Sequence, residues 1–422
     1  MPRRSSMLVV LVAPVVLGPL MPLVGLGCVR SEPLAAPSAA SPPPPPSPAW
    51  TSAPVPPPGA DLVPAGFVQL AAGADFACGL TKHGVVYCWG DGRFGQTGSR
   101  EAQEVGPWPR AVPGLERVAR LGVGRFHACA LWSSGAAACW GHNAVGLLGN
   151  GDELDSPVPV EVVGLPGPIL ALGSGATVAH GCAVLASGAL WCWGSNDHGQ
   201  LGDGTITRAR TRPRPVAGLE DVRGFAVGYI HTCAVDAGGR VSCWGWNPHG
   251  LVDSDAPDTA DFTVPRPKAG LADVVQLTAG NHHSCARHAS GKVSCWGFEG
   301  QGQLGDGSGH EHAEPRPVAG LDDAVDLASG GSHSCAVRRE GTVVCWGRNY
   351  YGQLGNGTTE DQPRPVEVVG LHDALDVEVG ADFSCALSRT QGASCWGRNH
   401  DGQLGDGTTE DRLTPAPVVL PP

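Results

Sequence analysis

Cys335-Ala-Val-Arg-Arg-Glu-Gly-Thr-Val-Val-Cys-Trp-Gly347 sets a pattern that occurs seven times in this 422-residue chain. In each copy, two runs of alternating apolar residues flank a polar centre, which is typical of two β-strands joined by a tight turn. Fourteen of the 15 cysteines fall into these copies, as pairs ten positions apart. The pairs are Cys78 and Cys88, Cys129 and Cys139, Cys182 and Cys192, Cys233 and Cys243, Cys285 and Cys295, Cys335 and Cys345, and Cys385 and Cys395.

The cysteine spacing determines the turn between the two strands. The number of residues between the cysteines is odd, so a three-residue loop places the pair face to face. Such a loop favours a left-handed residue, normally glycine, at its third position. Six copies have glycine there, whereas the seventh has Gln391 followed by Gly392.

The facing cysteines then lie three pairs from the loop, at a non-hydrogen-bonded position where opposed side chains approach closely. We therefore predict one cross-strand disulfide per copy. Zinc is the alternative for paired cysteines, but zinc sites use cysteines about two to four residues apart, and this chain lacks that spacing. The tryptophan after each second cysteine, such as Trp346, is expected to fill the space against the next repeat.

The repeats predict an all-β fold. Successive first cysteines lie 50 to 53 residues apart, a period that indicates a propeller or a solenoid. Each unit has room for four short strands, which in the sixth copy are Val325 to Ala328, the two hairpin arms and the proline-rich Pro363 to Val369. Because Pro-x-Pro lacks hydrogen-bond donors, it suits an outer edge. Seven such units indicate a seven-bladed β-propeller with blades of about 50 residues.

Two motifs resemble the repeats of the regulator of chromosome condensation family. They are Cys-Trp-Gly-x-Asn-x-x-Gly-Gln-Leu-Gly-Asp-Gly-Thr at 395–408 and Gly-x-x-His-x-Cys-Ala at 330–336, and the resemblance covers residues 66–420. It implies seven blades around a central channel. The chain starts with an inner-strand segment, Phe67 to Gly73, and stops on Pro415 to Leu420, which looks like the opening segment of a further unit. We therefore expect the N- and C-terminal strands to close the ring by completing one shared blade.

Two segments precede the predicted propeller, which takes residues 66–422. Residues 1–28 combine Arg3 and Arg4 with an apolar run that ends at Cys28, the one unpaired cysteine, and resemble a bacterial lipoprotein signal whose cysteine is lipidated. Gly25 and Leu26 depart from that signal's preferred residues, so ordinary cleavage near Ala40, giving a secreted protein, is the alternative. The proline-rich residues 29–65 predict an extended, disordered tether.

Composition argues against several functions. A net charge of −12 without a basic cluster does not suit nucleic-acid binding. The repeated Gly-Gln-Leu-Gly segments lack the Lys-Ser/Thr ending of a phosphate loop and predict tight turns. No nucleophile–base pair, metal cluster or cofactor loop stands out, so we expect no catalytic residues, no metal and no cofactor.

Other polar patterns have both a structural and a functional interpretation. Histidine precedes the first cysteine by two residues in five copies, and we expect it to be buried and hydrogen-bonded to its own blade's backbone rather than to form a metal ring. The Asp253 to Asp261 and His310 to His312 segments are solvated loops or metal sites. The alternating arginines of Arg208 to Arg214 form a solvated edge or an anion-binding strip.

The connections that follow Trp-Gly differ most among the copies and should emerge on one face of the propeller. We predict that this face binds a ligand or partner. Its candidate residues are His142, Trp246, His249, Phe298, Arg348, Tyr350, Tyr351, Arg398 and His400.

The predicted function is an exported, non-enzymatic scaffold that binds an unidentified protein or polysaccharide of the bacterial cell envelope and meets the membrane only through a lipid anchor. The alternative is a hydrolase or lyase at the channel mouth, because fold alone does not decide function. Guanine-nucleotide exchange, which the family resemblance implies, requires an intracellular partner. The export signal and disulfides argue against that location.

Overall fold

The computed structural model describes residues 66–99, 105–175 and 179–420. The predicted signal, the tether and Cys28 lie outside these residues. Within them, regular structure consists of β-strands and one short 3-10 turn, η1 (Pro248–Gly250), and no helix has the length and apolarity needed to span a membrane.

The strands form seven antiparallel sheets of four consecutive strands each. Blade 1 contains β1 (Phe67–Ala72), β2 (Phe76–Thr81), β3 (Val86–Gly90) and β4 (Gly106–Ala111), and blade 2 contains β5 (Val118–Val123), β6 (His127–Trp132), β7 (Ala137–Gly141) and β8 (Ser156–Glu161). Blade 3 contains β9 (Ile169–Ser174), β10 (His180–Leu185), β11 (Leu190–Asn196) and β12 (Thr207–Pro215), and blade 4 contains β13 (Val222–Val227), β14 (His231–Asp236), β15 (Val241–Trp246) and β16 (Asp261–Pro267).

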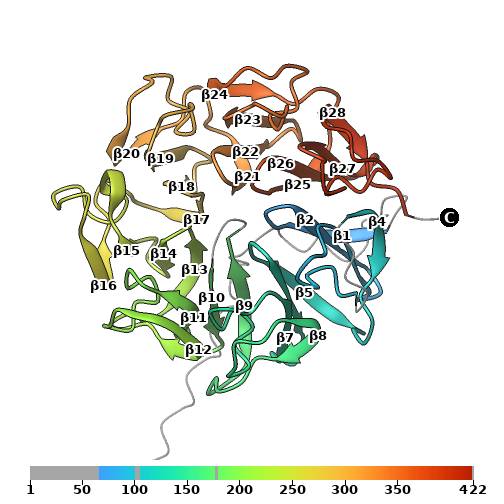
Figure 1. Ribbon diagram of the computed structural model, residues 1–422. Helices are drawn as coiled ribbons and strands as arrows, with labels where there is room; N and C mark the ends of the chain where they lie inside the picture. The colour runs from blue at the N-terminus through green and yellow to red at the C-terminus, as the bar shows by residue number, and fades with distance from the viewer. Residues whose placement is uncertain (1–65, 100–104, 176–178, 421–422) are drawn as a thin grey trace, which may run out of the picture. The chain divides into compact units, whose positions relative to one another are not determined.

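Blade 5 contains β17 (Val274–Ala279), β18 (His283–His288), β19 (Val293–Gly297) and β20 (His312–Pro317). Blade 6 contains β21 (Ala324–Ser329), β22 (His333–Arg338), β23 (Val343–Gly347) and β24 (Gln362–Glu367), and blade 7 contains β25 (Ala374–Val379), β26 (Phe383–Ser388), β27 (Gly392–Gly397) and β28 (Arg412–Pro417). Figure 1 shows the first strand of each blade innermost and the proline-rich fourth strand outermost, as the sequence predicts.

The blades form a closed ring. The inner strands contact one another in chain order, and β1 contacts β25, which joins blade 1 to blade 7. This confirms the seven-bladed propeller. The expectation of a shared blade is wrong, because β28 pairs with β27 as the fourth strand of blade 7 and β1 pairs with β2. The proline-rich segment therefore ends a blade rather than opening one.

The hairpin of blade 6 illustrates the predicted turn. Arg338 donates its backbone N–H to Thr342 O at 2.8 Å, which closes a loop over residues 339–341. Gly341, the third loop residue, has φ +90°. In blade 7 the positive φ moves from the position of Gln391 to Gly392, and the register between the two cysteines is unchanged.

One disulfide joins the two cysteines of each blade, with Cα–Cα distances of 4.0 to 4.1 Å. This short separation fits a non-hydrogen-bonded pair. The disulfide of blade 6 packs in one cluster with Trp396 of blade 7, and the disulfide of blade 7 packs with Trp89 of blade 1. Each disulfide thus faces the following blade and is buried by it.

The tryptophans face the opposite way from the prediction. Successive residues of a strand point to opposite sides of the sheet, so the residue after each second cysteine points toward the preceding blade. Each indole Nε1–H donates to a carbonyl of that preceding blade at 2.8 to 3.0 Å. Trp89 of blade 1 donates to Gln403 O of blade 7, and this bond belongs to the contact that closes the ring.

The repeated histidines also join neighbouring blades. Four of them place Nε2 at 2.7 to 2.9 Å from a hydroxyl of the following blade, so the expectation of a bond within the blade is wrong. The pairs are His180 with Thr232, His231 with Ser284, His283 with Ser334 and His333 with Ser384. Burial lowers the pKa of these four histidines to about 3, so the rings are neutral at ordinary pH.

Candidate functional site

Two sets of connections emerge on one face of the propeller, which we call the loop face. The residue after each Cys-Trp-Gly donates its backbone N–H to the connection between the first two strands of the same blade. Arg348 donates to Ser332 O at 2.9 Å, and Arg398 donates to Asp382 O at 3.0 Å. His142, Trp246 and Phe298 occupy the same position in blades 2, 4 and 5, so five of the nine predicted residues share one structural position.

A buried asparagine shapes the connection after the third strand in five blades. In blade 7, Asn399 accepts the Leu404 N–H at 3.0 Å through Oδ1. Its Nδ2 donates to Asp406 Oδ1, Thr408 O and Glu410 O at 3.0 to 3.3 Å. In these five blades, one amide group therefore fixes the loop that follows the third strand from inside.

Blade 5 has Glu299 in place of this asparagine. Its Oε2 accepts the Leu304 N–H at 2.6 Å, whereas its buried Oε1 has no hydrogen-bond partner within the described parts of the chain. Burial raises the pKa of Glu299 to about 7, and the nearby Asp306 acts in the same direction. A protonated Oε1 is a hydrogen-bond donor, as the asparagine Nδ2 is in the five blades that carry it.

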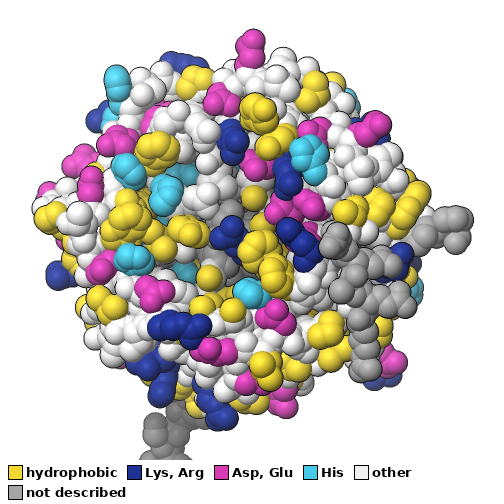
Figure 2. All heavy atoms as spheres, in the orientation of Figure 1, with side chains coloured by type: hydrophobic (Ala, Val, Ile, Leu, Met, Phe, Trp, Pro, Cys, Tyr) yellow, Lys and Arg dark blue, Asp and Glu magenta, His cyan; other side chains and the backbone are white. Residues whose placement is uncertain are grey.

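An aromatic patch covers blades 4 and 5 and includes His198 from blade 3. Trp246 stacks on His198 with ring centroids 5.4 Å apart and approaches His282 at 6.4 Å. His249 lies 4.9 Å from Phe298 and 6.4 Å from His282. Figure 2 shows histidine and hydrophobic side chains gathered on the left, over these blades. Of the predicted residues, Trp246, His249 and Phe298 therefore come together here.

A tyrosine–arginine cluster brings together the five predicted residues of blades 6 and 7. Tyr350 and Tyr351 meet edge to face at 4.8 Å, and Tyr351 lies 5.7 Å from His400. The guanidinium groups of Arg348 and Arg398 each lie 6.0 Å from the Tyr351 ring. Tyr350 is 66% exposed, so this cluster presents an aromatic surface to solvent.

His142 belongs to neither group. Its ring lies 4.5 Å from Phe94 and 6.2 Å from Phe126, and it pairs with Asp155 at 3.0 Å. The nine predicted residues thus share the loop face but form three separate groups.

A pocket of about 400 Å³ lies between these groups, lined by the first connections of blades 1, 2, 4, 5 and 7. Arg398 pairs with Asp75 across the contact between blades 7 and 1, and Arg348 pairs with Asp382 at 3.2 Å. Burial raises the pKa of Asp75 and of Asp382 despite these arginines. Lys, Arg, Asp and Glu side chains lie mainly above and to the right of the central hollow in Figure 2.

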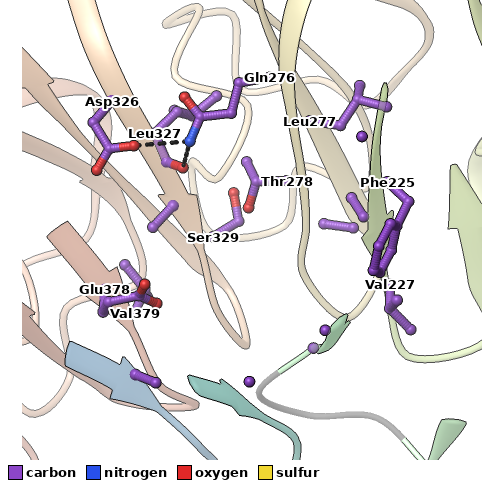
Figure 3. Close-up of a pocket in the computed structure, with 18 of the residues that line it drawn as sticks. Phe225, Val227, Gln276, Leu277, Thr278, Asp326, Leu327, Ser329, Glu378 and Val379 are labelled. Atoms are coloured by element: carbon purple, nitrogen blue, oxygen red, sulfur yellow. Dashed lines mark hydrogen bonds between the residues drawn. The ribbon is translucent and has the colours of Figure 1, made fainter. Parts of the chain in front are cut away.

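The inner strands of all seven blades line an axial cavity of about 250 Å³. Figure 3 shows Phe225 and Val227 on one side and Glu378 pointing in from β25 on another. The charged residues that line it are Arg287, Asp326 and Glu378. These three residues come from three different blades, so no single repeat predicts that they lie together.

The acids of the inner strands influence one another's protonation. Burial raises the pKa of Glu378 to about 8, and Asp326 adds to this shift. Burial and the neighbouring Asp326 and Glu378 also raise the pKa of Asp376. The Glu378 carboxyl group thus holds its proton near neutral pH.

The remaining sequence candidates are engaged elsewhere. His312 lies 3.2 Å from Asp306, and Glu311 pairs with His249 at 2.8 Å. Asp261 pairs with His198 at 2.9 Å. In the described segments, no three His, Cys, Asp or Glu side chains are placed to hold a metal ion.

The arginines of β12 are partly paired. Arg208 lies 2.7 Å from Glu153, and Arg210 lies 3.1 Å from Asp203. These contacts tie the outer strand of blade 3 to blade 2 and to its own preceding loop.

Sequence reasoning missed His198, Tyr229 and His282 on the loop face. Tyr229 and His282 belong to the connection between the first two strands, and His282 lies 6.1 Å from Tyr229. The signal was available, because this connection varies among the copies as the later one does.

Comparisons with known proteins agree with the fold. The chain is 32% identical over 248 residues to the ultraviolet-B receptor UVR8 of Arabidopsis thaliana, covering 57% of this chain and 55% of the receptor. It is 28% identical over 249 residues to the E3 ubiquitin-protein ligase HERC2 of Homo sapiens, covering 56% of this chain and 5% of the ligase. The matched part is therefore about half of the receptor and a small part of the ligase.

Two solved structures share the architecture. Prp20p of Saccharomyces cerevisiae gives a TM-score of 0.70 at 23% identity, covering 80% of this chain and 86% of that chain. Human WBSCR16 gives a TM-score of 0.69 at 24% identity, covering 76% of this chain and 86% of that chain. At these identities the likeness establishes the fold.

The family model named Regulator of chromosome condensation (RCC1) repeat matches residues 83–131, 187–235, 290–337, 340–387 and 395–422. A second model of this repeat matches residues 67–96, 222–251, 274–303, 324–353 and 375–403. With its repeats matched along the propeller, the chain belongs to the regulator of chromosome condensation repeat family.

Proposed function

We propose that the protein is a non-enzymatic binding scaffold of the bacterial cell envelope, anchored by a lipid on Cys28, whose loop face recognises a protein or polysaccharide. The observation that carries this proposal is that two aromatic groups from different blades each reach one pocket, the first through His282 beside Trp246 and the second through Arg398 beside Tyr351. Rigid repeats with varied loops are a common basis for recognition.

The two aromatic groups suit such a role. Tyrosine, tryptophan and arginine are enriched among the residues that dominate binding energy in protein interfaces. Exposed aromatic faces such as that of Tyr350 can also stack on the apolar faces of sugar rings. The seven disulfides are typical of an oxidising, extracytoplasmic environment, which supports a partner in the envelope.

Affinity capture from intact envelopes, together with a glycan array, tests the binding face. The triple variant Trp246→Ala, Tyr350→Ala, Tyr351→Ala should lose the captured partner or glycan by about tenfold or more, because aromatic anchors commonly dominate binding energy. The matched control replaces Val264, Val369 and Leu413 by alanine, since these apolar residues are exposed by 39, 53 and 39% on or beside the outer strands of their blades. Equal recovery with both triple variants would contradict the proposed face.

The anchor has a separate test. Cys28→Ser should move the protein from the membrane fraction to the soluble extracytoplasmic fraction and abolish a lipid-modified N-terminal peptide in mass spectrometry. A wild-type N-terminus near residue 41 would instead support ordinary cleavage and a secreted protein.

A further inference from the structure

Two acids, Asp326 and Glu378, and one base, Arg287, line the axial cavity. Asp326 is well satisfied, because it accepts from Gln276 Nε2 at 2.8 Å and from the Val377 N–H at 3.1 Å. Arg287, which donates to Gln276 Oε1 at 2.8 Å, is near enough to Asp326 for the two charges to attract. Arg287 and Asp326 therefore offset each other.

Asp376 is not available to a ligand, because it is 3% exposed. Burial raises its pKa, and so do the charges of Asp326 and Glu378 and a side-chain hydrogen bond with Asp326. A protonated Asp376 that shares its proton with Asp326 needs no further partner. Of the three acids, Glu378 therefore remains without a neutralising partner.

Glu378 is the member of the cluster that a ligand can reach. It lines the cavity, and its carboxyl group points into the open space in Figure 3. At the corresponding inner-strand position the other six blades carry Ala71, Gly122, Gly173, Ala226, Thr278 and Ala328. Among the seven described inner strands, Glu378 is thus the one ionisable side chain at this level of the channel.

Apolar side chains lie across the cavity from Glu378. Phe225, Leu172 and Val227 line the space, and Figure 3 shows the ring of Phe225 on the far side of the cavity from Glu378. An aromatic ring attracts cations as well as apolar groups. A metal ion such as Ca²⁺ takes about six to eight oxygen ligands, whereas one free carboxylate beside an apolar wall suits an organic cation.

We propose that the axial cavity binds a small organic ammonium ion, whose charged head pairs with Glu378 and whose apolar body packs against Phe225 and its neighbours. The cavity volume of about 250 Å³ is sufficient for a small amine. This site lies inside the channel and is independent of the loop-face partner.

Calorimetry and thermal unfolding of the full chain with n-butylammonium test the proposal. Butylammonium should bind and raise the melting temperature, while butyrate and butanol, which share its chain length but lack the positive charge, should not. Since burial raises the pKa of Glu378 to about 8, binding near pH 7 should also release a proton. Titrations in two buffers with different heats of ionisation measure that release.

Glu378→Gln should weaken butylammonium binding by at least about tenfold, because it removes a charged hydrogen bond. Glu367→Gln, on the exposed outer strand β24, changes the net charge equally and should leave binding unaltered. Equal binding to all variants, or no preference for butylammonium over butyrate, would overturn the proposal. If Glu378→Gln fails to fold, the wild-type protein decides, because butylammonium binding without proton release would also overturn it.

Discussion

At the scale of single residues, one position shows how adjacent blades match each other. Where the position two before the first cysteine is histidine, the next blade supplies a hydroxyl in four of five cases. Where it is Phe76 or Phe383, the next blade supplies Ala128 or Ala77 in the same buried cluster. The exception is His127, which faces a blade with Gly181 in the hydroxyl position.

The Phe–Ala pairs predict a rescue. Ser284→Ala leaves the buried His231 Nε2 without its partner at 2.7 Å and should cost about 1–3 kcal/mol of unfolding free energy. Adding His231→Phe recreates the pair found at Phe76 and Ala128 and should recover most of that loss. Urea unfolding of the two single variants and the double variant measures the coupling, and simple additivity would show that the two side chains do not act as a pair.

Glu299 predicts a pH-dependent weakness in blade 5. Its folded pKa of about 7 lies above the ordinary value of 4.5, so its stabilising contribution is complete below pH 4.5 and is lost as the pH rises through 7. Glu299→Gln supplies a permanent N–H donor. The variant should match the wild type near pH 4.5 and exceed it by about 1–3 kcal/mol at pH 8.

Comparing the two proteins at each pH cancels the histidines, whose lowered pKa values act in the opposite direction. Chemical denaturation at several pH values provides the measurement. A constant difference across this range would show that Glu299 does not titrate in the folded protein.

At the scale of elements, the hairpin turn governs the register of each blade. Gly341 has φ +90°, and a Cβ atom there would lie 2.8 Å from His372 O and 2.9 Å from the Asp373 Cα. Both the left-handed backbone and the contact with the next blade thus require glycine.

Gly341→Ala should therefore cost about 2–4 kcal/mol, from left-handed strain and displaced neighbours. Gly370→Ala is the matched control, because Gly370 has φ +82° but a Cβ atom added there would meet no other atom within 4 Å. It should cost only about 1–2 kcal/mol. If thermal unfolding shows equal losses of stability for the two variants, the contact with blade 7 adds nothing to the preference for glycine at position 341.

The elements were the most predictable part of the protein. Period-two patterns, the cysteine spacing and Gly341 depend on local geometry, which repetition shows seven times. The direction of Trp346 and the partner of His231 depend on which neighbour each sheet face meets, and a single repeat does not encode that. The cluster of Asp326, Asp376 and Glu378 could not be predicted because β21 and β25 bring together acids 50 residues apart in sequence.

At the scale of the whole molecule, the ring closes where blade 1 meets blade 7, the one pair of neighbouring blades that is not consecutive in the sequence. Trp89 Nε1 donates to Gln403 O at 2.9 Å across blades 1 and 7, just as Trp346 donates to Gln303 O at 3.0 Å across blades 5 and 6. The closing contact thus uses the same interaction as the internal ones.

Trp89→Phe and Trp346→Phe should lower the unfolding free energy by similar amounts, about 1–3 kcal/mol, because each leaves one buried carbonyl without its donor. Equilibrium denaturation monitored by the remaining tryptophans compares them. A much smaller loss for Trp89→Phe would indicate that the ring opens readily between its first and last blades.

The pairing of histidine with hydroxyl and of phenylalanine with alanine has a consequence for how such a chain can change over evolution. Phe383 packs against Ala77 of the following blade. If the following blade carried a serine such as Ser284 at this position, the phenylalanine ring would bury the serine hydroxyl without a hydrogen-bond partner. Duplication, loss or exchange of a repeat is therefore tolerated only where the residues at these two positions match those of both neighbouring blades. The order of the repeats is itself inherited information.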